Sequence, residues 1–380
     1  MTTATKERAT RKTRSGGTQL AWSVGALKAA LAAVRDAVPS NSPQPILRNV
    51  LFRDGLLTAT DLEIQIETAW SCEGLPPLLL PYQRLWSIVS LCRPDAEVTL
   101  SLSGSSCVVR SGSSEWTIPV EDAAEFPAME AGELKTLPRL PADQFARAVR
   151  SVVYAVDAES SRYALGAVLV EVAGDKVTMV ATDGRRLSRV ELDHDIATDD
   201  SATLVSRRAL ATLARLADSA GDDAGVQLEA STSCLVAEIG GTTVTARLTE
   251  GRFPRWRDVF PERDVAATAV DRGELLAATR AAAIVTTEQS KGIDYTISEG
   301  GIWLHGQSSE SGESSVTCPI VEFGQAVTTK MDPRYVADFL TGLPADAEPN
   351  VEIEAVDSES AVLLKCGDCW GVVMPMAKDA

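Results

Sequence analysis

One order of helices and strands recurs three times along this chain of 380 residues, and the repeat constrains the fold more than any other feature. A helix with one apolar face is followed by short strands, then by a second helix and three more strands. The order starts near residue 18, again near 133 and again near 258. A period of about 120 residues is too long for a solenoid, so each repeat should have its own core.

Local signals support the individual elements. Leu27, Leu31 and Val34 are spaced by four and three residues, which places them on one face of a helix. Asp54-Gly55 lies between two apolar runs and is typical of a hairpin turn. Ser206 is typical of the residue that caps a helix start. We therefore predict an α+β fold of three tandem domains, 18–132, 133–257 and 258–380, each a duplicated β-α-β-β-β motif with antiparallel sheets.

Composition excludes several classes of protein. No apolar run approaches the roughly 18 residues that a membrane span needs, and residues 1–17 lack the apolar segment of a signal peptide. We interpret those first residues as a disordered basic tail. The cysteines are few, scattered and odd in number, which fits a reducing cytoplasm. Only two histidines are present, too few for most histidine-based catalysis or metal sites.

The formal net charge of −17 argues against a nucleic-acid partner, but the arrangement of charge decides binding. Basic residues outnumber acidic ones in the predicted helices, so the strands and loops are strongly acidic. Helices that line one positive surface would attract phosphates without reading bases. The alternative is that arginine is simply a good helix former on exposed faces. The residues expected to face DNA are Lys28, Arg84, Arg93, Arg147, Arg150, Arg207, Arg208, Arg215, Arg280 and Arg334.

No catalytic constellation stands out. Cys366-x-x-Cys369 is a lone pair without a second pair or a nearby histidine, so an ordinary hairpin is favoured over a zinc or redox site. No glycine-rich phosphate loop occurs, and no carboxylate has an identifiable acid–base partner. We predict a protein that is not an enzyme and needs no cofactor or metal.

Three short segments have unusual residue types: ATDGRRL at 181–187, EGRFPRWRDVFP at 250–261, and the terminal VVMPM at 372–376. The last is apolar where most chains end polar, although a terminal strand packed on its own sheet would explain it. Together, a turn, an interdomain segment and a methionine-rich end could form a groove for an apolar peptide.

With these segments in this order, the chain resembles the bacterial beta sliding clamp, the beta subunit of DNA polymerase III, over about residues 18–376. The resemblance implies two crescent subunits joined head to tail in a ring around duplex DNA. It also implies a groove between the second and third domains, which would bind the polymerase alpha subunit, the clamp loader and other proteins with a clamp-binding motif. Carried over by position, the groove residues are Leu165, Thr182, Gly184, Arg185, Arg186, Leu187, Pro254, Val259, Tyr335, Val362, Val373, Met374, Pro375 and Met376.

The resemblance further implies a homodimer interface of Trp116 and Ile118 against Ile284 and Val285. Arg185 stands where the family commonly has histidine, Asp258 where arginine is frequent, and Ser290 where an aromatic residue is frequent. We predict a non-catalytic processivity factor of DNA replication, cytoplasmic and associated with the nucleoid. The alternative is a clamp-like regulator that docks peptides without encircling DNA.

Overall fold

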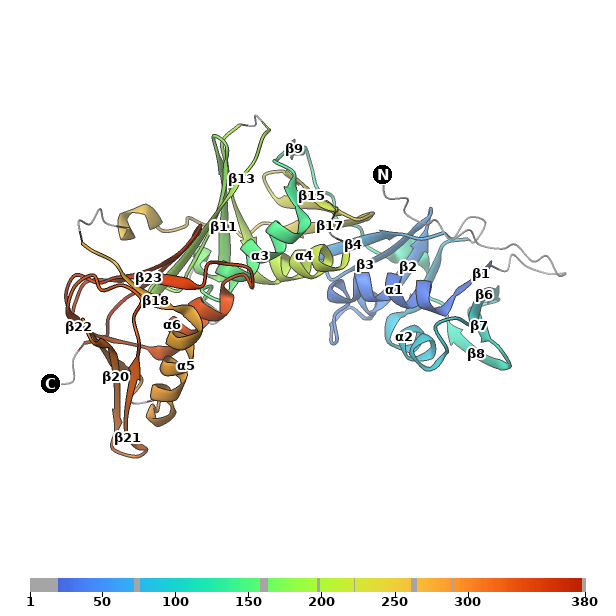
Figure 1. The fold of residues 1–380 in the computed structure, drawn as a ribbon. Coiled ribbons are helices and arrows are strands. Elements are labelled where there is room, and N and C mark those ends of the chain that lie inside the picture. Colours follow the sequence, from blue (N-terminus) through green and yellow to red (C-terminus); the bar gives the residue numbers. More distant parts are fainter. Residues whose placement is uncertain are drawn as a thin grey trace. The chain divides into compact units, whose positions relative to one another are not determined.

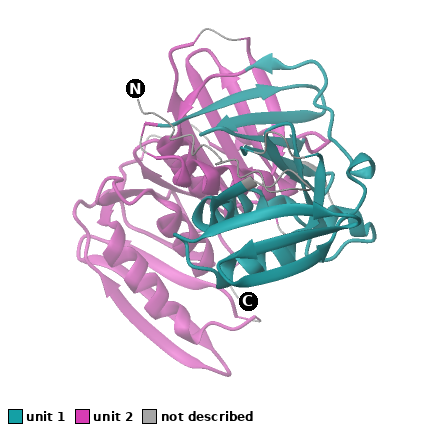
Figure 2. Cartoon of the chain, turned by 90° about the vertical axis from the view of Figure 1, so that its right-hand side faces the viewer, with its two compact units in different colours: residues 1–136, 224–247 teal, residues 137–223, 248–380 magenta. Residues whose placement is uncertain are grey.

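The computed structural model describes residues 20–71, 76–157, 163–196, 199–221, 223–260, 265–288 and 290–377 (Figure 1). The predicted basic tail and Cys72 lie outside these residues. The chain divides into two compact units, which Figure 2 colours separately. Unit 1 comprises residues 1–136 and 224–247, and unit 2 comprises residues 137–223 and 248–380. Among the described helices, none is both long and apolar enough to cross a membrane.

The described residues of unit 1 form two α-helices and two antiparallel sheets. Its helices are α1 (Val24–Val34) and α2 (Tyr82–Leu91). One sheet has the order β1 (Leu20–Ser23), β6 (Glu97–Ser103), β7 (Ser106–Ser111), β8 (Ser114–Pro119). The other includes, in order, β15 (Gly225–Ala230), β16 (Cys234–Ile239), β17 (Thr242–Arg247), β4 (Ile64–Ala69), β3 (Leu56–Thr60), β2 (Asn49–Arg53) and β5 (Leu78–Pro81), and the short β9 (Lys135–Thr136) also pairs with β15.

In unit 2, the part of the chain that the structure describes forms four α-helices and two further antiparallel sheets. The helices are α3 (Ala142–Val153), α4 (Arg207–Ser219), α5 (Arg272–Ala282) and α6 (Pro333–Gly342). The larger sheet has the order β14 (Ser201–Ser206), β11 (Ala167–Ala173), β12 (Lys176–Thr182), β13 (Arg186–Asp193), β25 (Cys369–Val373), β24 (Val362–Cys366), β23 (Asn350–Glu354), β18 (Thr268–Asp271). The smaller has the order β21 (Gly312–Cys318), β20 (Gly301–Ser308), β19 (Ile293–Ser298), β22 (Val327–Met331), and the two-residue strand β10 (Leu140–Pro141) precedes α3.

The local signals in the sequence produce the expected elements. The Ser23 hydroxyl accepts from the Ala26 N–H and starts α1, and the Ser206 hydroxyl accepts from the Ala209 N–H and starts α4. Asp54 and Gly55 have φ values of 53° and 82°, as a tight hairpin between β2 and β3 requires. The predicted α+β class with antiparallel sheets is confirmed.

Equivalent turns in the first and second repeats have the same internal hydrogen bonds. In one, Asp61 Oδ1 accepts from the backbone N–H groups of residues 63 and 64. In the other, Asp183 Oδ1 accepts from those of residues 185 and 186. The residue after each aspartate has a positive φ, 76° at Leu62 and 83° at Gly184. Leucine is strained at a positive φ, so the turn in the first repeat has a cost in conformational free energy.

The larger sheet of unit 2 joins the second and third repeats. β13 and β25 pair antiparallel, with Arg186 opposite Val373 and Val190 opposite Cys369. On this sheet α3 packs against β12 and β13, and α6 packs against β25. α3 also contacts α6, where a Cβ on Gly342 would lie 2.8 Å from the Tyr154 ring. The sheet therefore runs across the predicted boundary near residue 257, while the boundary itself stays a prediction.

Candidate functional site

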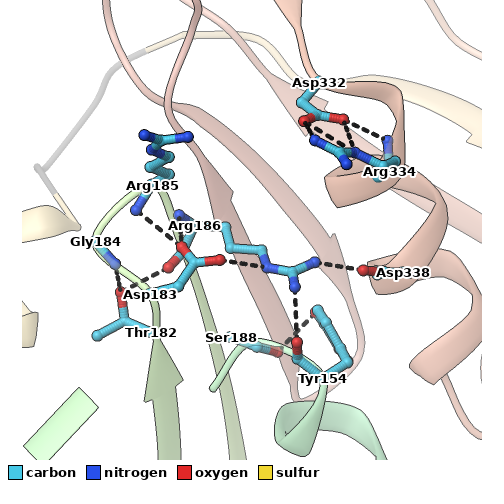
Figure 3. Close-up of polar contacts among 10 residues, drawn as sticks. All are labelled: Tyr154, Thr182, Asp183, Gly184, Arg185, Arg186, Ser188, Asp332, Arg334 and Asp338. Carbon is cyan, nitrogen blue, oxygen red and sulfur yellow. Dashed lines mark hydrogen bonds and ion pairs between the residues drawn. The ribbon is translucent and has the colours of Figure 1, made fainter. Parts of the chain in front are cut away.

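The ATDGRRL segment forms a tight turn between β12 and β13 that its own side chains hold (Figure 3). Asp183 Oδ1 accepts from the backbone N–H groups of Arg185 and Arg186, each at 2.9 Å. The Thr182 hydroxyl donates to the Arg186 carbonyl at 2.6 Å and accepts from the Gly184 N–H at 3.0 Å. These bonds lie within five residues, so the turn is defined locally.

Arg186 links this turn to the end of α3 and to α6 (Figure 3). Its Nε donates to Asp183 Oδ2 at 3.0 Å, Nη1 to Asp338 Oδ2 at 2.5 Å, and Nη2 to the Tyr154 carbonyl at 2.7 Å. The centroids of the Tyr154 and Tyr335 rings lie 5.3 and 4.7 Å from its Cζ, within the range of cation–π attraction. The side chain is only 13% exposed. The guanidinium is therefore engaged within the protein.

The charges at this site follow from burial and from the paired carboxylates. Burial disfavours the charged form of Arg186, but the hydrogen bond to Asp338 and the charge of Asp183 outweigh it, so the guanidinium pKa is raised. Burial raises the pKa of the Tyr154 phenol, which donates to Ser188 Oγ at 3.0 Å. Arg185 is exposed. It is thus the arginine of this turn that a ligand can reach.

The C-terminal segment leaves the sheet beside the same turn. The Met374 N–H donates to the Arg185 carbonyl at 2.9 Å, and the Met376 N–H donates to the Lys330 carbonyl at 2.7 Å. The Met374 side chain is 42% exposed, while Pro375 is partly buried. The segment therefore runs from the β12–β13 turn to β22 and presents an apolar side chain to solvent.

An apolar cluster adjoins the turn and includes Trp256 of the segment that begins at residue 250. Trp256 packs with buried residues of β11, β12, β13, β24 and β25, and Leu187 is one of them. Phe253, Val259 and Phe260 are partly buried against this cluster. The aromatic residues of this segment therefore pack against the sheet and hold the segment on it.

The structure brings together most of the predicted groove residues. Thr182, Gly184, Arg185, Arg186, Leu187, Tyr335, Val373 and Met374 lie at or next to the turn, and Val362 is buried opposite Val373. Leu165 is partly buried, and its carbonyl accepts from the Asp157 N–H at 3.0 Å. Pro254 is exposed two residues before Trp256. Their role in binding a ligand stays a prediction.

Several residues that build this site could not be recognised in the sequence. Asp338 pairs with Arg186 across 152 residues, and Tyr154 supplies both a ring and a carbonyl to the same arginine. The Trp370 ring contacts two cations, with its centroid 4.7 Å from Arg189 Cζ and 4.4 Å from Lys365 Nζ. Contacts between distant segments leave no spacing that a single sequence could reveal.

Two residues that depart from the family pattern have partners here. Asp258 Oδ2 lies 3.2 Å from Arg255 Nε in an exposed ion pair, so its charge is partly compensated. The Ser290 hydroxyl donates to the Gln307 carbonyl at 2.6 Å. Neither side chain is left with an unmatched polar group.

The residues predicted for the dimer interface differ in exposure. A cavity of about 600 Å³ lies in unit 1 between α2 and β8, and its lining includes Ile88, Trp116 and Ile118. Trp116 is partly buried and Ile118 is only 4% exposed, so Ile118 forms part of the cavity wall. In unit 2, Ile284 is 80% exposed, whereas Val285 is 9% exposed. Of Ile284 and Val285, only Ile284 is exposed enough to contact a second copy of the chain.

The cations predicted to face DNA lie on or beside the helices, and several already have acidic partners. Arg93 pairs with Asp95 at 2.8 Å just after α2. Arg334 pairs with Asp332 at 2.7 Å at the start of α6, and that carboxylate raises the guanidinium pKa. Lys28 of α1 lies 5.7 Å from the centroid of the Trp86 ring of α2. Contact with DNA by these residues stays a prediction.

No group of three or more histidine, cysteine, aspartate or glutamate side chains placed to hold a metal ion occurs among the described residues. Cys366 and Cys369 face each other at the end of the β24–β25 hairpin. Burial raises the pKa of both thiols, which makes them poor nucleophiles.

The comparisons with known proteins agree on one family. The family model described as DNA polymerase III beta subunit, central domain, matches residues 139–255. The beta sliding clamp of Synechococcus elongatus is 28% identical over 352 residues, covering 89% of this chain and 92% of the relative. That of Escherichia coli is 26% identical over 342 residues, covering 87% and 92%. Over most of its length, the chain is therefore similar to beta sliding clamps.

Solved clamps share the whole fold with this chain. The DnaN sliding clamp of Pseudomonas aeruginosa bound to griselimycin has a TM-score of 0.88 at 26% identity, covering 95% of this chain and all of the clamp. The pol III beta of Caulobacter crescentus has a TM-score of 0.85 at 26% identity, covering 94% of this chain and all of that protein. The predicted clamp fold is confirmed, and the matched relatives and solved structures support a DNA sliding clamp function.

Proposed function

We propose that two copies of this chain join head to tail into a ring that encircles duplex DNA and tethers the replicative DNA polymerase to it. The observation that carries the proposal is the correspondence with a complete clamp over 95% of the chain. A ring holds DNA by enclosure, so it needs no base-specific contact. Tethering raises the effective concentration of the polymerase at the primer end without any chemistry in the clamp. The proposed location is the cytoplasm, at the nucleoid.

The basic helices support DNA as the enclosed polymer. In unit 2, α3 and α4 carry Arg147, Arg150 and Arg207, while the protein as a whole carries a net charge of −17. Phosphate contacts of this kind are independent of sequence and weaken as salt rises. Such contacts suit a protein that moves along duplex DNA.

The turn at 182–186 and the C-terminal segment support a peptide-binding groove. Exposed Arg185 and exposed Met374 lie beside the turn, and buried Leu187 belongs to the apolar cluster around Trp256, so a cation and an apolar side chain lie near an apolar cluster. The proposed ligands are short motifs with apolar anchors in the polymerase alpha subunit, the clamp loader and other clamp-binding proteins. An anchor that is buried here would gain about 1.5–3 kcal/mol.

Met374→Glu is expected to weaken peptide binding at least tenfold, because a carboxylate would meet the apolar anchors of the peptide. The measurement is fluorescence anisotropy with a labelled pentapeptide that carries leucine and phenylalanine anchors. Val321→Glu, at a side chain that is 63% exposed elsewhere in unit 2, is the matched control. Equal affinities for the two variants would contradict a groove at Met374.

The cavity in unit 1 and the exposed Ile284 in unit 2 support the head-to-tail interface. Trp116, Ile118 and Ile88 give the cavity an apolar wall, and an isoleucine from a second copy would fill part of its volume. Pairing of the β8 edge with a partner would also remove an exposed strand edge.

The decisive test of enclosure is retention on DNA of different topology. Protein loaded by a clamp loader is expected to stay on a nicked circular duplex at about 0.5 M salt, where phosphate contacts are largely screened. It is expected to slide off the same DNA after linearisation. Equal loss from circular and linear DNA, together with only monomer at micromolar concentration, would instead favour the regulator that docks peptides without encircling DNA.

A further inference from the structure

The arginines of α3 are held by carboxylates from two other segments of unit 2. Arg150 Nη1 lies 2.7 Å from Asp218 Oδ2 and 3.0 Å from Asp218 Oδ1, at the end of α4. Arg147 Nη1 lies 2.5 Å from Asp346 Oδ2, in the loop after α6. Arg147 Nη2 lies 2.6 Å from Asp143 Oδ2 on α3 itself. Both arginines of α3 are therefore paired with carboxylates before any DNA arrives.

The three carboxylates are not equivalent. Asp143 lies in the first turn of α3, where the helix dipole favours a negative charge. Asp218 lies in the last turn of α4, where the dipole disfavours one. Asp346 lies in a loop rather than a helix, so no helix dipole accounts for it. The helix dipole therefore accounts for the negative charge at Asp143 but not for those at Asp218 and Asp346. These two charges are instead stabilised by the arginines they face.

The loop that carries Asp346 is held in place. Arg272, at the start of α5, donates Nη1 to the Pro344 carbonyl and Nη2 to the Ala345 carbonyl, both at 2.7 Å. The backbone and the Arg147 side chain lower the pKa of Asp346, so this carboxylate is charged at neutral pH. Asp346 is nonetheless 66% exposed and Asp218 is 50% exposed. Both pairs lie where a phosphate could compete for the arginine.

We propose that Asp218 and Asp346 are built-in counter-ions that compete with DNA phosphates for Arg150 and Arg147. This rests on the proposed function, because it needs the α3–α4 surface to meet the enclosed duplex. A phosphate that contacts a paired arginine must either displace the carboxylate or share the arginine with it. The negative charge of the carboxylate also repels the phosphate. The ion pairs therefore keep the affinity for DNA low, as sliding along the duplex requires. Arg207 differs, since it is exposed at the start of α4 and none of the described acidic side chains pairs with it.

The test is the binding of the full-length protein to a labelled 30-base-pair duplex at several salt concentrations, without a loader. Asp218→Asn and Asp346→Asn are each expected to raise affinity about two- to fivefold near 50 mM salt, with an effect that shrinks as salt rises. The matched control is Asp193→Asn, which removes an exposed aspartate paired with Lys176 on the β12–β13 hairpin. This control has the same change in net charge and is expected to alter affinity less than twofold.

Arginine variants separate failure of this proposal from failure of the proposed function. Arg207→Gln is expected to flatten the slope of log affinity against log salt by about 0.9, and Arg150→Gln by clearly less. If the arginine variants weaken binding but both asparagine variants match Asp193→Asn, the counter-ion proposal is wrong and the DNA surface stands. If no arginine variant changes binding, the DNA surface is wrong and the counter-ions are wrong with it.

Discussion

Ile284→Arg is expected to convert the proposed head-to-tail dimer into a monomer. Ile284 is 80% exposed in the single chain, so burying it in a partner would contribute about 1.5–3 kcal/mol per interface. An arginine there would lose this gain and place a guanidinium against the side chains of Trp116 and Ile118, where its desolvation adds a further cost of several kcal/mol. The dimer dissociation constant should rise at least a thousandfold, and sedimentation velocity at micromolar concentration measures the change.

The control for this prediction is Val321→Arg, which adds the same charge at another exposed apolar residue of unit 2. It should remain a dimer. Trp116→Ala should weaken the dimer from the other side of the interface without adding a charge. A dimer of unchanged affinity in Ile284→Arg would place the interface elsewhere on the chain.

Arg186→Gln is expected to loosen the site at the end of β13. The change leaves Asp183, Asp338 and the Tyr154 carbonyl without their shared donor, at a cost of about 1–3 kcal/mol. Hydrogen exchange should accelerate in residues 183–190 and 333–342, because the guanidinium connects these two segments. Affinity for the labelled pentapeptide should fall about tenfold as the turn loses its fixed position.

Arg185→Gln is the neighbouring control, because that side chain is exposed and outside the network. It should leave stability within about 0.5 kcal/mol and hydrogen exchange unchanged. Arg186→Lys keeps the charge but lacks the planar fork of donors, so an intermediate result is expected. If Arg186→Gln behaved like Arg185→Gln in hydrogen exchange, the network would have no positioning role.

The elements with local signals were predictable from the sequence. Apolar residues three and four apart produced α1, Asp54-Gly55 produced the β2–β3 hairpin, and Ser206 capped α4. The turn after β12 was also recognisable, because its hydrogen bonds lie between residues 182 and 186. Short strands that run directly into helices, such as β5 and β18, have too few residues to show alternation.

The sequence by itself determined the helices, the strands with local signals and the motifs that carry the resemblance to sliding clamps, because each depends on residues that are close together or on motifs in a given order. Only the tertiary structure decided that β13 pairs with β25, that Arg186 joins Asp338, and that Ile284 is exposed while Val285 is buried. Backbone hydrogen bonds between strand edges are alike for almost any sequence. An ion pair between distant residues leaves no periodic pattern, and neighbouring apolar residues look the same until packing buries one of them.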